Sequence, residues 1–219
     1  MKAFFLSCLT LVPAPLLACD LALVLAVDVS GSVDRDEYNT QMQGLATGLR
    51  DGIVVDALID QSAKVTLIQW SGSTRQRQTV PWVQIGSYAD VLSLADRIAN
   101  DPRVWRNFST AVGEALDASL AALEGVSDCT RKVIDVSGDG VSNEGVAPQS
   151  IHPALKAQGV IVNGLAIETD QTDLTAYFFG NLIIGEGAFV VTANGFEDYP
   201  AQIKRKLQRE TTKQLSSLD

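Results

Sequence analysis

Three short segments of the chain carry oxygen side chains in a pattern that could hold a hard metal ion. The first reads Asp-x-Ser-Gly-Ser, and its alternate residues Asp28, Ser30 and Ser32 project the same way in an extended backbone. The other two segments contribute Thr110 and Asp139. Carboxylate and hydroxyl oxygens, with water completing the shell, suit Mg²⁺, with Mn²⁺ or Ca²⁺ as alternatives. These five residues are therefore the candidate metal ligands.

The first segment has a second interpretation when it is taken alone. An aspartate and two serines between a strand and a helix are also typical of a turn and a helix cap. Gly31 lets the backbone approach a ligand with no side chain in the way. A metal site therefore depends on whether the fold brings the three segments together.

Four apolar runs are typical of strands that are buried on both faces of a parallel sheet. Two shorter runs, at 78–83 and 188–192, predict edge strands, and Pro81 confines the former to an edge or irregular position because it cannot donate to a sheet ladder. The four buried runs are Leu21–Val27, Lys64–Trp70, Lys132–Ser137 and Val160–Ile167.

Helical patterns lie between these runs, marked by acidic first turns, cap residues and helical spacing of apolar residues. Strands that alternate with helices predict a doubly wound α/β fold, with helices on both faces of a mostly parallel sheet. Ligands bind such sheets at the carboxyl ends of the strands, where the candidate ligands lie. The predicted helices are Asp34–Leu49, Val91–Ala99, Ala111–Leu123, Pro148–Gln158, Thr172–Phe179 and Phe196–Thr211.

Residues 1–18 have the layout of a secretory signal peptide, with Lys2, an apolar run and a small-residue exit at Ala18. A buried first strand is the alternative for the apolar run. We expect cleavage after Ala18, one domain over residues 19–219, and a periplasmic or secreted protein. No run is long enough to be a transmembrane segment, and the net charge of −9 disfavours nucleic acid and anionic lipid as partners.

Taken together, the three segments resemble the metal site of von Willebrand factor A domains. The first is similar to that family's Asp-x-Ser-x-Ser signature, and Thr110, ahead of Ala115 and Leu116, is similar to its threonine before a small-plus-aliphatic helix pattern. The run that ends in Asp139 resembles a strand ending in Thr-Asp-Gly, although Gly138 stands where threonine is common. The resemblance extends to small exported bacterial proteins of unknown function, and it implies a six-stranded sheet with one antiparallel edge strand.

The resemblance implies a metal-ion-dependent adhesion site. Ser30, Ser32 and Thr110 would bind the ion directly, and Asp28 and Asp139 would act through water or through hydrogen bonds to the serines. Few directly bound charges keep the cation electrophilic, so a Glu or Asp carboxylate of a partner protein would complete its shell.

The resemblance also gives the cysteines outside the leader a position. It makes the strands before Asp28 and Asp139 parallel neighbours, about 4.8 Å apart, so Cys19 and Cys129 would form a disulfide at the edge opposite the metal. A lipid anchor on Cys19 is the alternative, because Leu16–Cys19 is an imperfect lipobox. The two exclude each other, since a lipidated sulfur cannot form a disulfide.

Asp135 is not explained by this scheme. It lies within a strand that should be buried, and a buried carboxylate needs a partner or a raised pKa. Arg131, Lys132 or a residue elsewhere in the chain could be that partner. Helix-cap or loop roles are expected for Asp34, Asn143, Glu144 and His152.

Three functions are compatible with these residues. The first is a non-enzymatic module that binds an acidic group of a partner protein through Mg²⁺; the sequence has no Gly-x-Ser-x-Gly, P-loop or Gly-x-Gly-x-x-Gly motif. The second is a Mg²⁺-dependent phosphatase with Asp28 as nucleophile, which is disfavoured because Ser30 stands where such enzymes have a second acid. The third is an envelope protein in which the metal site is purely structural.

Overall fold

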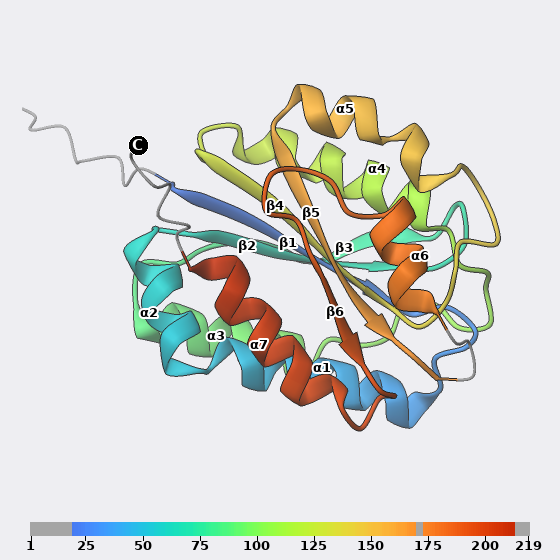
Figure 1. Ribbon diagram of the computed structural model, residues 1–219. Coiled ribbons are helices and arrows are strands. Elements are labelled where there is room, and N and C mark those ends of the chain that lie inside the picture. The colour runs from blue at the N-terminus through green and yellow to red at the C-terminus, as the bar shows by residue number, and fades with distance from the viewer. Residues whose placement is uncertain (1–18, 170–172, 213–219) are drawn as a thin grey trace, which may run out of the picture.

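Six strands form a single sheet in a computed structural model that describes residues 19–169 and 173–212; the expected signal peptide lies outside these residues. The strands are β1 (Leu21–Asp28), β2 (Lys64–Trp70), β3 (Gln76–Gln84), β4 (Arg131–Gly138), β5 (Val160–Ile167) and β6 (Val190–Ala193). Their order in the sheet is β3-β2-β1-β4-β5-β6 (Figure 1). Only β3 is antiparallel to its neighbour among these strands, so the predicted mostly parallel sheet with one antiparallel edge strand is confirmed.

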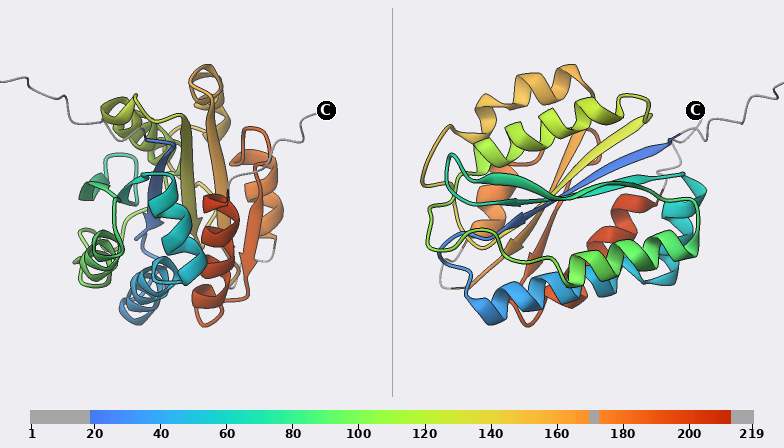
Figure 2. Two further views of the ribbon diagram at one scale, coloured as in Figure 1. Left: turned by 90° about the vertical axis from the view of Figure 1, so that its left-hand side faces the viewer. Right: turned by 180° about the vertical axis from the view of Figure 1, so that it is seen from behind.

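Helices cover both faces of this sheet, which confirms the doubly wound α/β architecture (Figure 2). The helices are α1 (Arg35–Leu49), α2 (Gly52–Asp60), α3 (Tyr88–Ala99), α4 (Val112–Leu123), α5 (His152–Ala157), α6 (Leu174–Asn181) and α7 (Tyr199–Thr211). One face is covered by α1, α2, α3 and α7, and the other by α4, α5 and α6. Short 3₁₀ turns at Glu124–Val126 and Pro148–Ser150 follow α4 and precede α5.

The central strand β1 owes its place to a run of apolar residues that ends at Asp28. All eight of its residues are buried. Leu23 and Leu25 pack in the core beneath α1 and α7, and Val24 and Ala26 pack in the core beneath α4. Because both faces are covered, the strand is apolar throughout rather than alternating. Asp28 is thus the first polar side chain of the strand and stands at its carboxyl end.

The direction of the chain after this strand is set by the start of α1. The Asp34 carboxylate accepts hydrogen bonds from the backbone N–H groups of Asp36 and Glu37, and Glu37 accepts one from the Asp34 N–H in return. This reciprocal capping box ends the loop that carries the two serines. The structure therefore confirms the helix-cap role that was expected for Asp34.

Several elements begin or end a few residues from their predicted bounds, and two helices differ most from the sequence prediction. Helix α2 was not predicted, because its nine residues are mostly apolar and such a short run does not separate a helix from a buried strand. Its N-cap is Asp51, which accepts from the Ile53 N–H. The helix predicted over Pro148–Gln158 is a 3₁₀ turn followed by α5, which begins at His152. No helix within the described residues is long and apolar enough to cross a membrane.

Candidate metal centre

The hydroxyls of the candidate site form one hydrogen-bonded chain at the carboxyl edge of the sheet. Ser32 Oγ donates to Asp139 Oδ1 at 2.7 Å, and it lies 3.3 Å from Ser30 Oγ. Thr110 Oγ1 donates to Ser30 Oγ at 3.3 Å. Asp28 joins the group through Oδ1, which accepts from the Ser30 backbone N–H at 2.7 Å. The fold therefore brings all five predicted residues together.

Asp28 lies in an environment that disfavours its charged form. Its side chain is fully buried, and its Oδ2 atom has no hydrogen-bond partner among the described residues. Burial, and then the charge of Asp139, raise the pKa of Asp28 from 3.8 to about 8. An unpartnered buried carboxylate oxygen needs a proton or a cation. The site thus carries a polar atom that a bound cation would satisfy.

Asp139 adds a second buried carboxylate to the same cluster. It is 4 % exposed, and burial raises its pKa. Two carboxylates and three hydroxyls form an all-oxygen donor set, which suits hard divalent cations. In the described part of the chain no three or more His, Cys, Asp or Glu side chains are grouped so as to hold a metal, and this cluster instead combines two carboxylates with three hydroxyls.

Asn143 holds Thr110 in place from both sides. Its Oδ1 atom accepts from the Thr110 N–H at 2.9 Å, and its own N–H donates to the Thr110 carbonyl at 2.9 Å. The neighbouring Glu144 accepts from the Ser73 N–H and hydroxyl at 3.1 and 2.9 Å. Both were predicted as loop or cap residues, and both tie the loop after β4 to its neighbours.

The loop that carries the serines approaches the Thr110 loop closely. The Gly31 N–H donates to the Phe108 carbonyl at 2.8 Å. A Cβ atom on Gly31 would lie 3.3 Å from both that carbonyl oxygen and the Asn107 Cα atom. A side chain at this position would therefore press against the backbone of the Thr110 loop, and glycine lets the two loops pack closely. Beside them Ser32, Thr110 and Asp139 line a hollow of about 260 Å³, and Ser32 is exposed, so the cluster can be reached from solvent.

Arg103 holds the serine loop, the segment 29–34 that carries Ser30 and Ser32. The sequence analysis did not predict this role. Its Nη2 atom donates to the carbonyls of Val29 and Ser30 at 2.9 and 2.8 Å, and its Nη1 donates to the Asp34 carbonyl at 3.2 Å. The guanidinium charge also lowers the pKa of Asp28, against the larger effect of burial. No short motif marks this arginine, because it comes from a loop far along the chain.

Gly138, the departure from the family pattern, leaves room for its neighbours. A Cβ atom at this position would lie 3.0 Å from Asp28 Oδ2 and 3.4 Å from Trp70 Cζ2. Trp70 is fully buried at the end of β2, beside Asp28 in the sheet register. The missing side chain thus accommodates a bulky neighbour, and Asp139 keeps its place in the cluster.

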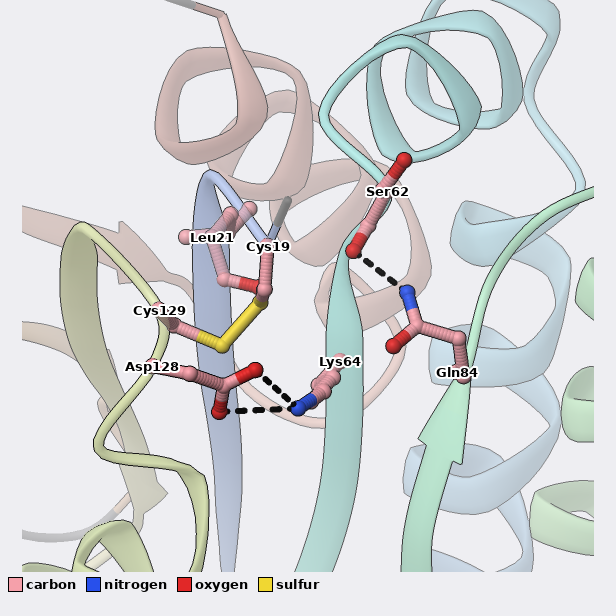
Figure 3. The surroundings of a disulfide bond; sticks show 7 residues. All are labelled: Cys19, Leu21, Ser62, Lys64, Gln84, Asp128 and Cys129. Atoms are coloured by element: carbon pink, nitrogen blue, oxygen red, sulfur yellow. Dashed lines mark hydrogen bonds and ion pairs between the residues drawn. A yellow bond between two sulfur atoms is a disulfide. The ribbon is translucent and has the colours of Figure 1, made fainter. Parts of the chain in front are cut away.

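The two cysteines lie at the opposite edge of the sheet. Cys19 and Cys129 precede β1 and β4 and form a disulfide with a Cα–Cα separation of 4.5 Å (Figure 3). Beside it, Lys64 Nζ donates to both carboxylate oxygens of Asp128 at 2.9 and 2.7 Å. The structure therefore has the pairing that the resemblance implied, and a sulfur in this bond cannot carry a lipid.

Of the partners considered for Asp135, Arg131 and Lys132 are wrong, and a residue elsewhere in the chain is the one that the structure has. Its carboxylate pairs with Lys206 Nζ of α7, which also donates to Glu210 Oε1 at 2.5 Å. Arg131 donates instead to the Glu210 carbonyl at 2.8 Å. Burial, and then Asp135, raise the pKa of Glu210 to about 8. Protonation of Glu210 removes one negative charge from this buried cluster.

Comparison with known proteins places the chain in a family. Residues 18–215 match the family described as "Protein of unknown function (DUF1194)". The chain belongs to the DUF1194 family. The comparison with curated proteins gave no match.

Solved structures show what fold this DUF1194 protein has. Proximal thread matrix protein 1 from the mussel byssus is similar with a TM-score of 0.65 at 19 % identity, over 86 % of this chain and 47 % of that one. A von Willebrand factor type A protein from Catenulispora acidiphila gives 0.60 at 16 % identity, over 88 % and 42 %. The pilus adhesin SpaC from Lactobacillus rhamnosus GG gives 0.63 at 14 % identity, over 88 % and 31 %. The chain has a von Willebrand factor A-like fold.

The neighbours are longer than this chain, and one of them has been solved with a metal ion bound. The DUF1194 chain spans less than half the length of each of the three. The mussel protein has also been solved with a zinc-occupied MIDAS motif, at 14 % identity and a TM-score of 0.65, over 89 % of this chain and 46 % of that one. These neighbours are matrix, adhesin and von Willebrand factor type A proteins.

Proposed function

We propose that this DUF1194 protein is a metal-dependent protein-binding module that holds Mg²⁺ at its candidate site and uses it to bind a carboxylate of a partner protein. One observation carries the proposal: the buried, unpartnered Oδ2 atom of Asp28 lies in a cluster with three hydroxyls and a second buried carboxylate. When bound, the cation supplies a Lewis-acid point that accepts an anionic oxygen.

The contacts of the five residues support a division of roles. Ser30, Ser32 and Thr110 offer hydroxyl oxygens directly to the cation. Asp28 accepts from the Ser30 N–H, and Asp139 accepts from the Ser32 hydroxyl, so each aspartate orients one serine. With both aspartates acting mainly through these contacts, the site keeps its affinity for a further anionic ligand.

Burial of Asp28 favours this function over phosphoryl transfer. A nucleophilic carboxylate must reach the phosphorus atom of its substrate, and the Asp28 side chain is 0 % exposed. Exposure of Ser32 and the hollow beside it favour a site that meets a partner over a closed, purely structural one. The geometry therefore supports binding best of the three predicted functions.

The disulfide indicates the cellular compartment in which the protein works. Disulfides persist in oxidising compartments, and Cys19 and Cys129 are paired. We infer a periplasmic or secreted protein, with residues 1–18 as its signal peptide and residues 19–219 as the mature domain.

A partner-capture experiment tests this function. The immobilised, disulfide-bonded chain is incubated with an extract of the cell envelope in Mg²⁺ or in EDTA. We expect a partner that is retained in Mg²⁺, released by EDTA and lost from the Ser30→Ala/Ser32→Ala variant. The matched control is Ser93→Ala on the exposed side of α3, which should retain it. A partner that stays bound in EDTA would show that the metal edge is not the docking surface.

A further inference from the structure

A groove of about 530 Å³ lies next to the candidate metal centre. Its walls are the first half of α1 and the segment 99–107. Gly31 and Asn107 line one end, and these residues belong to the two loops that carry the candidate ligands. A chain segment bound at the metal centre can therefore continue into this groove.

The acidic side chains of the groove are already committed to hydrogen bonds within the protein. The Asp34 carboxylate caps α1, as described above. The Asp101 carboxylate accepts from Gln69 Nε2 at 2.7 Å and from Thr79 Oγ1 at 2.5 Å. Both carboxylates keep their negative charge, so three arginines against two aspartates leave the lining of the groove with a net charge of +1.

Three arginines line the same groove, and two of them have no such commitment. The Arg103 guanidinium donates its hydrogen bonds to the carbonyls of the serine loop. Arg35 and Arg106 are exposed and make no hydrogen bond or ion pair with the residues 19–169 and 173–212 that the structure describes. Burial, and then the nearby charge of Arg106, lower the pKa of Arg103, so the two guanidinium groups repel each other.

The net positive charge of this lining is opposite to the net charge of the whole protein. The chain has a net charge of −9, yet the three arginines and two aspartates of this groove sum to +1, and a bound divalent cation would add to that positive charge. A guanidinium presents a planar fork of donors that matches a carboxylate. The groove is therefore complementary to an anionic segment and unfavourable for a cationic one.

We propose that this groove is a second subsite for an acidic segment of the partner protein, in which Arg106 and Arg35 bind a second carboxylate beside the one at the metal. This inference rests on the proposed function, because the first carboxylate fixes the segment at the metal edge. It narrows the partner to proteins with an exposed, extended stretch that carries at least two Asp or Glu residues.

Defined peptides test the subsite without knowledge of the natural partner. Fluorescein-labelled hexaglutamate and a labelled serine peptide of equal length with a single glutamate are titrated with the full chain, at fixed ionic strength and saturating Mg²⁺ for each variant. Binding is followed by fluorescence anisotropy. Arg106→Ala, Arg106→Glu and Arg35→Glu are compared with Arg205→Glu, which makes the same charge change on an exposed residue of α7 outside the groove.

We expect hexaglutamate to bind more tightly than the single-glutamate peptide. Arg106→Ala should weaken hexaglutamate about threefold and Arg106→Glu about tenfold, as for charges at the rim of an interface. Arg35→Glu should weaken it too, while Arg205→Glu should change it far less. The single-glutamate peptide should respond little to any of these changes.

Failure of the subsite and failure of the metal site give different experimental results. Equal binding of the two peptides, equal effects of Arg106→Glu and Arg205→Glu, or no detectable binding of hexaglutamate by chain that does bind Mg²⁺ would overturn the subsite and leave the metal site standing. Calorimetry with Mg²⁺ alone tests the metal site itself. A chain that takes up no Mg²⁺ would overturn the proposed function, and with it the subsite.

Discussion

The hydroxyl of Ser32 donates a 2.7 Å hydrogen bond to Oδ1 of Asp139, across 107 residues of sequence. The two residues follow β1 and β4, which are parallel neighbours paired in register from Leu21 with Arg131 to Val27 with Ser137. Both loops therefore leave the sheet at the same edge and at the same height. The sheet register, rather than either loop alone, brings the candidate ligands together.

Replacing Arg103 with lysine should loosen the serine loop. One ammonium group cannot reach the three carbonyls that the guanidinium fork now satisfies. We expect the free energy of unfolding to fall by about 2 kcal/mol, as for the loss of hydrogen bonds to a charged group. We also expect Mg²⁺ affinity to fall several-fold, because Ser30 and Ser32 lose their fixed positions. Denaturant unfolding and calorimetry measure the two effects.

The matched control for that change is Arg97→Lys, on the exposed side of α3. It should leave both quantities near the wild-type values. If Arg103→Lys binds Mg²⁺ as tightly as the wild type, Arg103 does not position the site.

Removing the disulfide should cost stability and spare the metal site. The Cys19–Cys129 bond closes a loop with a sequence separation of 110 residues, and loss of a native disulfide typically costs about 2–5 kcal/mol. The Cys19→Ala/Cys129→Ala variant should lose about that much free energy of unfolding. Its Mg²⁺ affinity should be unchanged, because the bond lies at the other edge of the sheet.

Intact mass gives an independent check of the same bond. The exported protein should weigh less than its reduced form by the mass of two hydrogen atoms. A mass increased by a diacylglycerol would show instead that Cys19 is lipidated.

The buried Glu210 should make stability fall as pH rises. Its pKa is raised from 4.5 to about 8, first by burial and then by Asp135. The folded chain thus binds a proton that the unfolded chain releases between these pH values. The stabilisation is complete below pH 4.5 and is lost as pH rises through about 8, with a slope of about −1.4 kcal/mol per pH unit while one proton is released.

Glu210→Gln isolates this effect, because glutamine does not titrate. The difference in unfolding free energy between this variant and the wild type should shift in favour of the variant as pH rises from 5 to 8. The control Glu197→Gln changes an exposed carboxylate and should keep the wild-type slope. Parallel pH profiles for wild type and Glu210→Gln would mean that Glu210 is ionised throughout this range in the fold.

The strands and the candidate ligands were predictable because they are local. β2 and β5 have the predicted bounds, since each is a buried run whose ends are marked by a change of polarity. The five candidate residues stand in short motifs at strand or helix ends, and a sheet of this class gathers those ends at one edge.

The supports of the site were not predictable, because they depend on side chains that reach across the fold. Arg103 contacts a carbonyl 73 residues away, from a segment without regular structure. Lys206 reaches Asp135 from α7, and the sequence pattern fixes neither the angle nor the depth at which this helix packs. Arg131 and Lys132 are closer to Asp135 along the chain than Lys206 is. They stand at the start of β4, the end near the cysteines, and the ion pair of Asp135 is with Lys206.

The most direct test of the account is isothermal titration of the metal-free protein with Mg²⁺ and Mn²⁺. Wild-type protein should bind either ion, and Asp28→Ala and Asp139→Ala should each abolish binding, as should Asp28→Asn, which keeps the shape of the side chain. Asp56→Ala, at an exposed position of α2, should bind as the wild type does. Unchanged affinity in either site variant would contradict the assignment of the metal centre.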